Sequence, residues 1–380
     1  MKQKRRTNAN DAAARRLRSA ADPEAMDKIL QDECRRRASR KLAATLLCQE
    51  FRFPTELSAE QCTSDEVACI HAGMIFQGDI MADLTCGLGI DSFHCARKAS
   101  SVTAIELDPD VAAAIETNAR ALGLNNVQGI CADCADWLRN NPDRHFDVAF
   151  IDPARRGDNG RRLFGLHDCK PDVIELMPLI SRSADRLIVK ASPMLDMTVL
   201  LRDEGLKPHN ILIIGTRSEC KELVLDFDFK SPAPDEPLVR VITVGKGEFS
   251  FHPSDPAPMK LADPAVGCIV GEPWPAVMKS GAYNHLPGAR IHPSTHLYVL
   301  SAEEAAIFPG ETYRLEEIMA FSSSMIKQIG RRGVDASVAT RNFPISAEEL
   351  RRRLHARESS ERRLVGVTAS AGRLLLTLTR

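Results

Sequence analysis

Between Gln77 and Gly247, short apolar segments alternate with stretches of helical character, and this alternation is the feature that most restricts the fold. The apolar segments have the length and composition of buried strands. Strands that alternate with helices form a mostly parallel sheet with helices on both faces. The predicted strands are, in order, IMADLT, VTAIEL, VQGICA, FDVAFID, RLIVKA, NILIIGT, ELVLDF and VRVITV. The last two are joined by the proline-rich SPAPDEP and predict an antiparallel hairpin at one edge.

The chain on either side of this alternating region has a different character. Residues 1–75 are rich in Ala, Leu, Arg and Glu and predict several short helices, followed by the alternating pattern over residues 76–250. A proline-rich passage at residues 251–266 indicates a linker or irregular crossing. Beyond it, AEEAAIF, LEEIMAFSSSMIKQIGRR and SAEELRRRLHAR predict helices, and with SVATRNF, LVGVTAS and RLLLTLTR they predict small α+β modules.

Composition excludes several classes of protein. An odd count of 11 cysteines in a long chain indicates reduced thiols rather than a disulfide framework. Cys131 and Cys134 form a CxxC, but no second pair or nearby histidine has zinc spacing, so we expect no metal. No apolar run of about 18 residues occurs, and the N-terminus is too polar for a secretory signal, which predicts a soluble cytoplasmic protein without membrane contact. The formal net charge of -1 requires any nucleic-acid contact to come from a local patch.

The segment MADLTCGLGIDS, at the first predicted strand, has the spacing of a ligand-binding loop. The strand ends at Asp83, and glycines follow at Gly87 and Gly89 before a helix begins. Positions without side chains bring the backbone close to a ligand, and the helix directs its N-terminus at it. Such a loop serves many small molecules.

Three further strand ends carry acidic residues. Glu106 ends the second strand, where a carboxylate accepts hydrogen bonds from the vicinal hydroxyls of a ribose. Asp133 follows the third strand and is placed to accept from an adenine amino group. Asp152 and Pro153 follow the fourth. Asp108, by contrast, is expected to cap the next helix, with Pro109 in its first turn.

A nicotinamide-dependent enzyme would explain the glycine loop and the acid Glu106 at the end of the second strand. Gly87, Gly89 and Ser92 nearly match the GxGxxG spacing of such enzymes. Such an enzyme does not explain Asp152-Pro153. A proline directly after the acid fixes an extended loop over the reactive end of the ligand, as enzymes need when they position an acceptor for group transfer.

Together, DLTCGLGIDS, IELD and IDPARR resemble the motifs of class I S-adenosylmethionine-dependent methyltransferases. More narrowly, IDPARR, KASPMLDM, SECKELV and TRNFPIS are similar to bacterial members of that class with a C-terminal THUMP-like domain. The resemblance implies an α/β fold: an N-terminal helical region (1–75), a Rossmann-like methyltransferase domain (76–250), a ferredoxin-like module (268–315) and a THUMP-like domain (316–380). The family usually has a glycine where this chain has Cys86.

The resemblance also implies the site. The expected cofactor is S-adenosylmethionine, contacted by Asp83, Thr85, Gly87, Gly89, Asp91, Glu106 and Asp133. Asp152 and Pro153 are the expected catalytic residues. Asp152 either orients or deprotonates the acceptor, or it only anchors the cofactor or the loop. Arg155, Arg156 and Lys190 are the expected substrate contacts. An arginine could instead pair with a local acid such as Asp158, and Lys190 could snorkel to solvent.

The sequence says less about which group accepts the methyl group. Ala154 and Arg155 stand where enzymes that methylate exocyclic amines have a second proline and an aromatic residue, which disfavours that geometry. Cys169 is the nearest cysteine for uracil C5 chemistry, but a packing role suits it better. Between Arg331 and Arg363 nine arginines face five acids, a local net charge of 9 − 5 = +4.

Such a patch suits RNA phosphates, and THUMP domains bind RNA, so the resemblance implies a structured RNA substrate, rRNA or tRNA. The alternatives are a solvated basic helix, a protein or small-molecule acceptor, or a non-catalytic protein that binds S-adenosylmethionine or RNA.

Overall fold

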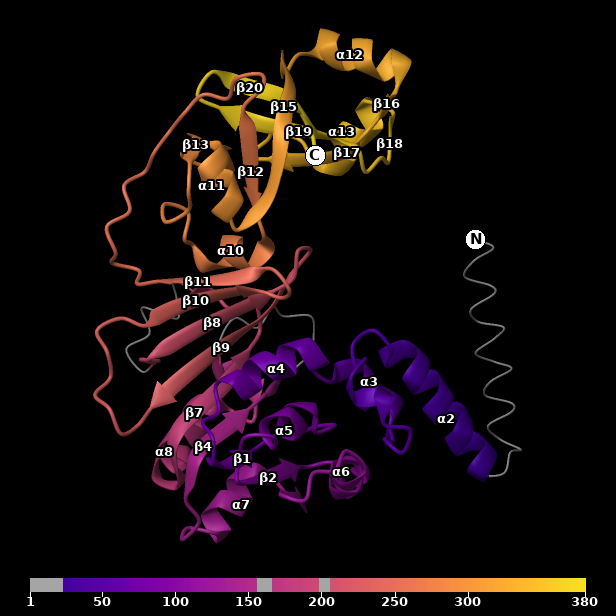
Figure 1. The fold of residues 1–380 in the computed structure, drawn as a ribbon, viewed down its shortest axis with the longest axis vertical. Coiled ribbons are helices and arrows are strands. Elements are labelled where there is room, and N and C mark those ends of the chain that lie inside the picture. The colour runs from indigo at the N-terminus through magenta and orange to yellow at the C-terminus, as the bar shows by residue number, and fades with distance from the viewer. Residues whose placement is uncertain (1–22, 156–165, 198–205) are drawn as a thin grey trace. The chain divides into compact units, whose positions relative to one another are not determined.

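The alternating region forms the predicted α/β sheet in the computed structural model, which describes residues 23–155, 166–197 and 206–380 (Figure 1). The nine strands have the order β11-β10-β8-β9-β7-β4-β1-β2-β3. Their bounds are β1 (Ile80–Asp83), β2 (Ser101–Glu106), β3 (Val127–Cys131), β4 (Phe146–Ile151), β7 (Ala184–Ala191), β8 (Asn210–Gly215), β9 (Cys220–Asp228), β10 (Leu238–Thr243) and β11 (Gly247–Phe251). The pairs β1–β2, β1–β4, β2–β3 and β4–β7 are parallel, as the alternation predicts.

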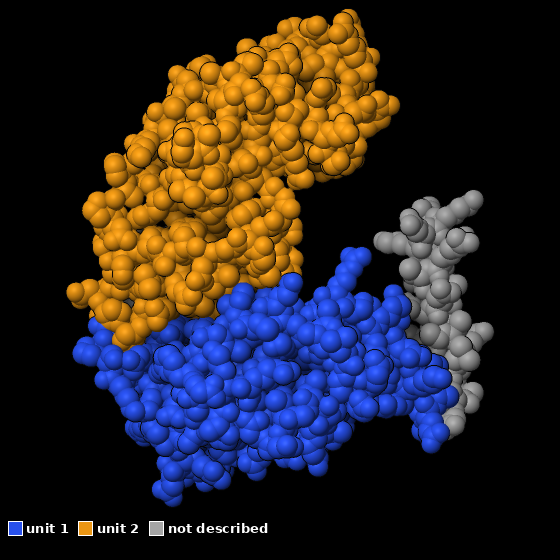
Figure 2. Space-filling view, viewed as in Figure 1, with its two compact units in different colours: residues 1–191, 225–233 blue, residues 192–224, 234–380 orange. Residues whose placement is uncertain are grey.

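The chain divides into two units, which Figure 2 shows in blue and orange. Unit 1 comprises residues 1–191 and 225–233, and unit 2 comprises residues 192–224 and 234–380, so the division passes through β9. The α/β helices of unit 1 are α5 (Ile90–Cys95), α6 (Pro109–Ala121), α7 (Cys134–Asn140) and α8 (Val173–Ser183). Between β4 and α8 lie β5 (Ala154–Arg155), η2 (Leu166–Asp168) and β6 (Cys169–Lys170).

The N-terminal helical region is confirmed within the described residues. It contains α2 (Pro23–Ala38), η1 (Thr45–Leu47), α3 (Glu56–Gln61) and α4 (Asp65–Gly73). Phe51 is fully buried and its ring meets that of Phe93 in α5 edge-on, with centroids 6.3 Å apart. Aromatic rings packed in this way contribute both apolar burial and favourable ring electrostatics. The region therefore packs on the helix that follows the first strand.

The expected cap of α6 is also confirmed. The Asp108 carboxylate accepts hydrogen bonds from the backbone amides of Asp110 (2.9 Å) and Val111 (3.2 Å), and Pro109 is the first helical residue. These contacts satisfy amides that have no partner inside the helix. Asp108 thus starts a helix, and the acid two residues before it, Glu106, is left at the end of β2.

The predicted hairpin between ELVLDF and VRVITV is wrong. In the sheet β9 lies between β7 and β8, and β10 pairs in parallel with β8. The apolar strand β8 is buried along nearly its whole length, so it needs hydrogen-bonding neighbours at both edges. A tight turn, in which the Thr216 amide donates to the Glu219 carbonyl oxygen (2.8 Å), brings β9 to one edge. The other edge is left for β10, whose antiparallel partner is β11.

The C-terminal part of unit 2 forms a second sheet with the order β13-β14-β12-β15-β20-β19-β17. Its strands are β12 (Ile269–Pro273), β13 (Ala289–His292), β14 (Thr295–Leu300), β15 (Gly310–Ala320), β17 (Ser337–Arg341), β19 (Arg362–Ala369) and β20 (Gly372–Thr379). The helices are α10 (Pro275–Ser280), α11 (Ala302–Ile307), α12 (Ser323–Arg332) and α13 (Ala347–Arg353), and β16 (Val334–Asp335) pairs with β18 (Ala356–Arg357).

The predicted helix over LEEIMAFSSSMIKQIGRR is wrong in its first half, because residues 315–320 belong to β15 and α12 begins only at Ser323. Glu316 and Glu317 are both exposed, which interrupts the alternation expected of a half-buried strand. The register opposite β20 shifts between Leu315 and Glu317, as in a β-bulge, and the strand continues beyond it. The expected ferredoxin-like module ends at position 315, but β15 continues past that position. Because β15 pairs with both β12 and β20, residues on both sides of position 315 belong to one sheet.

Within the described ranges, no helix has the length and apolar character that crossing a membrane requires.

Candidate active site

The strands β1, β2, β3 and β4 of unit 1 are parallel neighbours and end at the same edge of the sheet, and the predicted acidic residues lie at or directly after these ends. In the register, Asp83 of β1 pairs with Ala104 of β2 and Phe150 of β4, and Glu106 pairs with Cys131 of β3. Ligands of open α/β sheets bind outside the carboxyl ends of the strands. The four acidic strand ends therefore form a row along this edge in the strand order β4-β1-β2-β3, that is Asp152, Asp83, Glu106 and Asp133.

The loop after β1 has the conformation that its glycines permit. Gly87 and Gly89 have φ values of +53° and +86°, in the left-handed region. A Cβ on Gly89 would lie 2.7 Å from the Phe93 ring, so this glycine lets the chain pack against its own helix. Apart from its two chain neighbours, no described residue has a heavy atom within 4 Å of a Cβ placed on Gly87, which leaves room for a ligand. Among the described non-glycine residues only Asn342 and His355 have positive φ, so Cys86 replaces the family glycine without strain.

Asp83 is buried inside this loop, with 1% of its surface exposed. Its carboxyl group accepts hydrogen bonds from the Ser92 hydroxyl (2.6 Å) and from the Thr85 amide (3.3 Å). Burial raises its pKa to about 7, and the nearby negative charge of Asp91 adds to the effect, against the lowering influence of Ser92. Asp83 thus ties the strand end to the first turn of α5.

Glu106 holds the same loop from β2. Its two carboxylate oxygens accept from the amides of Gly87 (2.8 Å) and Asp108 (2.9 Å). Each oxygen has a further lone pair, so the group still has capacity for the hydroxyls of a ribose. Asp133 is exposed and caps α7 through one oxygen, Oδ1, which accepts from Ala135 and Asp136. Its other oxygen forms no hydrogen bond with a described residue.

Asp152 is tied to the loop after β1 and to β7. Its amide donates to the Thr85 hydroxyl (2.7 Å), and its Oδ2 accepts from Lys190 Nζ (2.6 Å). The Asp152 side chain is 45% exposed, whereas that of Lys190 is 7% exposed. Pro153 is buried directly after it. The carboxylate therefore faces solvent with an ammonium group behind it, and Lys190 does not snorkel.

Lys190 also joins a buried network that the sequence did not indicate. Its Nζ donates to the Thr63 hydroxyl (2.8 Å) and lies 3.4 Å from Asp91 Oδ2. Asp91 in turn accepts from Thr63 (2.5 Å), and its Oδ1 lies 2.7 Å from Nδ1 of the fully buried His71. Although burial raises the pKa of Asp91, the charges of Lys190 and His71 lower it overall. Thr63 and His71 lie far from the motifs in sequence.

The remaining expectations fall partly outside the described residues. Arg156 and Asp158 lie outside them, and for Arg155 the structure describes only the backbone, which pairs in β5 with Cys169 of β6. In the CxxC pair, Cys131 is exposed and Cys134 is buried, and burial raises the pKa of Cys134 to about 12.

Comparisons with known proteins fit this geometry. Residues 81–154 match the model of a methyltransferase domain family, and residues 310–380 match that of a THUMP domain-like family. A crystal structure of a protein assigned as a methyltransferase from Porphyromonas gingivalis W83 has 30% sequence identity and a TM-score of 0.81, and the match covers 92% of this chain and 88% of that chain. The chain belongs to the S-adenosylmethionine-dependent methyltransferases. The fold and cofactor expected from the sequence are confirmed.

Two further relatives of this methyltransferase differ in how much of it they match. An uncharacterized S-adenosylmethionine-dependent methyltransferase from Mycobacterium tuberculosis is 28% identical over 358 residues, covering 90% of this chain and 92% of the relative. A 23S rRNA (uracil(747)-C(5))-methyltransferase from Shewanella baltica is 35% identical over 77 residues, which is 20% of each protein.

The site of the methyltransferase fits its cofactor. The open space beside Gly87, the carboxylate of Glu106 and the free oxygen of Asp133 follow one another along the sheet edge. With the cofactor bound, they would supply a close backbone approach, an acceptor for ribose hydroxyls and an acceptor for an amino group. These are the groups that an adenosine moiety requires.

Proposed function

We propose that this methyltransferase methylates a structured RNA, rRNA or tRNA, which the C-terminal THUMP-like region docks. The observation that carries the proposal is the joining, in one chain, of a methyltransferase sheet edge and a THUMP-like region with unpaired arginines. The local similarity to 23S rRNA methyltransferases supports an RNA acceptor but extends over 77 residues only.

Ion pairs within the protein use about half of the arginines in the basic segment 331–363. Five of the nine pair with glutamate or aspartate: Arg341, Arg351, Arg353, Arg357 and Arg363. The other four are exposed and form no ion pair with any described residue: Arg331, Arg332, Arg352 and Arg362. Exposed cations without internal partners are the ones available to phosphates, because no internal ion pair has to be broken.

The residues of the strand ends divide the work of methyl transfer. S-adenosylmethionine, when bound, supplies an electrophilic methyl group. Glu106, Asp133 and the backbone at Gly87 hold the cofactor. Asp152 orients the acceptor by accepting a hydrogen bond from it, since its carboxylate is half-exposed at the edge of the sheet.

Lys190 acts behind Asp152 rather than on the substrate. It is buried, and its ammonium group contacts Asp152, Asp91 and Thr63. A cation held by two carboxylates and a hydroxyl keeps the Asp152 side chain in one orientation. We therefore assign Lys190 a positioning role and leave the contact with the acceptor to Asp152.

The test uses the purified protein, methyl-labelled S-adenosylmethionine and extracts of cells that lack the gene. We expect the label in RNA, from which ribonuclease releases it and protease does not. RNA from cells that carry the gene should take up far less label, because its target nucleotide is already methylated. Asp152→Asn should lower the rate by ~10²-fold or more, while calorimetry shows cofactor binding close to that of the wild type. Label in protein or in small molecules would refute the RNA acceptor and leave the methyltransferase assignment intact.

A further inference from the structure

A pocket of about 480 Å³ lies within the THUMP-like region, along α12 and beside the C-terminal end of α13. Its lining combines two kinds of side chain. Phe321 and Ile326 supply an apolar wall, and Lys327, Arg331, Arg353 and His355 supply cationic or hydrogen-bonding groups. None of the described residues that line the pocket is acidic. An apolar wall beside several cations fits a ligand that has both a flat or apolar part and an anionic part.

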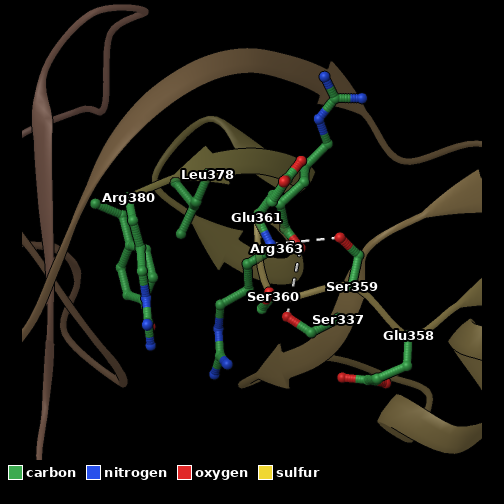
Figure 3. Close-up of a pocket in the computed structure, with 10 residues that line it drawn as sticks. Ser337, Glu358, Ser359, Ser360, Glu361, Arg363, Leu378 and Arg380 are labelled. Atoms are coloured by element: carbon green, nitrogen blue, oxygen red, sulfur yellow. Dashed lines mark hydrogen bonds between the residues drawn. The ribbon is translucent and has the colours of Figure 1, made fainter.

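Two other pockets of unit 2 are less suited to an anion. The pocket in Figure 3, of about 250 Å³, is lined by Arg363 and Arg380 but also by Glu358 and Glu361. The other contains Glu311, which accepts from Arg217 (2.6 Å) and from the Trp274 indole (2.9 Å). In both, carboxylates oppose the attraction of the cations for a phosphate.

Lys327 and Arg331 are the cations best placed to bind a phosphate. They are four residues apart in α12 and so lie on the same helix face. Both are exposed, and neither forms an ion pair with a described residue. Arg331 lies in the last turn, where a cation also complements the helix dipole, but Lys327 lies in the middle of the helix, where that explanation does not apply. Arg353 is paired with Glu349.

The pocket is held in shape by close packing between the two helix ends. A Cβ on Gly330 would lie 2.6 Å from the Arg353 carbonyl oxygen, so the helices approach at their glycine. His355 has a φ of +50°, a conformation that costs about 1 kcal/mol for a residue with a side chain. Its Nδ1 lies 2.7 Å from the Gly330 carbonyl oxygen, which fixes the ring at the pocket. The unfavourable backbone conformation of His355 therefore lies beside the pocket.

We propose that this pocket binds one nucleotide of the RNA substrate, with its phosphate on Lys327 and Arg331 and its base or ribose against Phe321 and Ile326. The inference rests on the proposed function, since it names where the docked RNA is held. RNA bases pack well on aromatic and apolar side chains, and RNA phosphates pair with exposed cations. The pocket supplies both within one preformed site.

The test compares Lys327→Gln and Arg331→Gln, singly and together, with Arg314→Gln. Arg314 is the control because it belongs to the THUMP-like region, is exposed and forms no ion pair with a described residue, but lies outside both the basic segment 331–363 and the pocket. Binding of the full-length protein to fluorescently labelled bulk tRNA and to a 23S rRNA transcript is measured by anisotropy over a series of salt concentrations. Circular dichroism and thermal melting check that each variant is folded.

We expect the double variant to weaken binding about tenfold or more and to reduce the slope of log K against log salt by roughly 1.4 to 1.8, the value for two lost phosphate contacts. Arg314→Gln should change both much less. If the wild type binds neither RNA, the proposed function fails. If it binds and the double variant matches Arg314→Gln, the pocket inference fails and the proposed function stands.

Discussion

Asp83→Asn should remove a pH dependence of stability from unit 1. With its pKa raised from 3.8 to about 7 by burial, Asp83 binds a proton more tightly in the folded state than in the unfolded state. The wild type therefore loses stability as pH rises through this interval, at about 1.4 kcal/mol per pH unit where the difference is largest. Between pH 5 and pH 7.5 the loss sums to roughly 2.5 kcal/mol. Asparagine resembles the protonated acid and does not titrate, so the variant should not lose this stability as pH rises.

Asp91 does not disturb this measurement. Its pKa lies below the ordinary value of 3.8, so the stability that it contributes is present above about pH 4 and is lost only as pH falls further. The window from pH 5 to pH 7.5 thus isolates the effect of Asp83 when the variant is compared with the wild type.

The assay is urea unfolding followed by tryptophan fluorescence. The chain has two tryptophans, Trp137 in unit 1 and Trp274 in unit 2, so a Trp274→Phe background makes Trp137 the reporter of unit 1. Asp143→Asn, at an exposed position, is the control for removing a carboxylate. We expect the free energies of unfolding of wild type and Asp83→Asn to diverge with rising pH. Parallel curves across the window would refute the argument that burial keeps Asp83 protonated.

Three further predictions concern the site. Lys190→Met should destabilise unit 1 by roughly 3 to 5 kcal/mol in the same unfolding assay, since it leaves Asp91 buried without its cation, and a loss under about 1 kcal/mol would count against the network. Glu106→Gln should weaken S-adenosylmethionine binding about tenfold or more in calorimetry because an amide accepts through one oxygen only; unchanged affinity would exclude its ribose role. In urea unfolding, Gly89→Ala should lower the free energy of unfolding more than Gly87→Ala does. In calorimetry, Gly87→Ala should weaken S-adenosylmethionine binding more than Gly89→Ala does. The reverse order in either assay would contradict the roles assigned to the two glycines.

The sequence predicted the loop and the acids at the strand ends because these are local properties. Strand ends show as apolar runs that stop at an acid, and Gly87 and Gly89 mark positions where the backbone needs positive φ. In a parallel sheet the ends of such strands meet at one edge, so the order Asp83, Glu106, Asp133 in the chain already implied a row in space.

The two wrong predictions arose where the local residue pattern favoured one structure and the pairing of strands in the sheet required another. A bulge in β15 placed Glu316 and Glu317 together on the exposed side, so the segment resembled a helix. The proline-rich SPAPDEP looked like a hairpin turn, yet β10 pairs with β8, which needed a neighbour at its second edge. Neither outcome can be derived from the segment alone, because each depends on which strand is available beside it.

By itself the sequence determined the parallel strands of unit 1, the glycine loop after β1 and the acids at the strand ends, since each follows from the periodicity and conformational preferences of a few adjacent residues. Only the tertiary structure decided how the acceptor side is built. Lys190 and Thr63 lie 127 positions apart, yet both contact Asp91, and Lys190 also contacts Asp152. Charged side chains leave water only when partners from distant segments replace their hydration, and that replacement is set when the segments pack together.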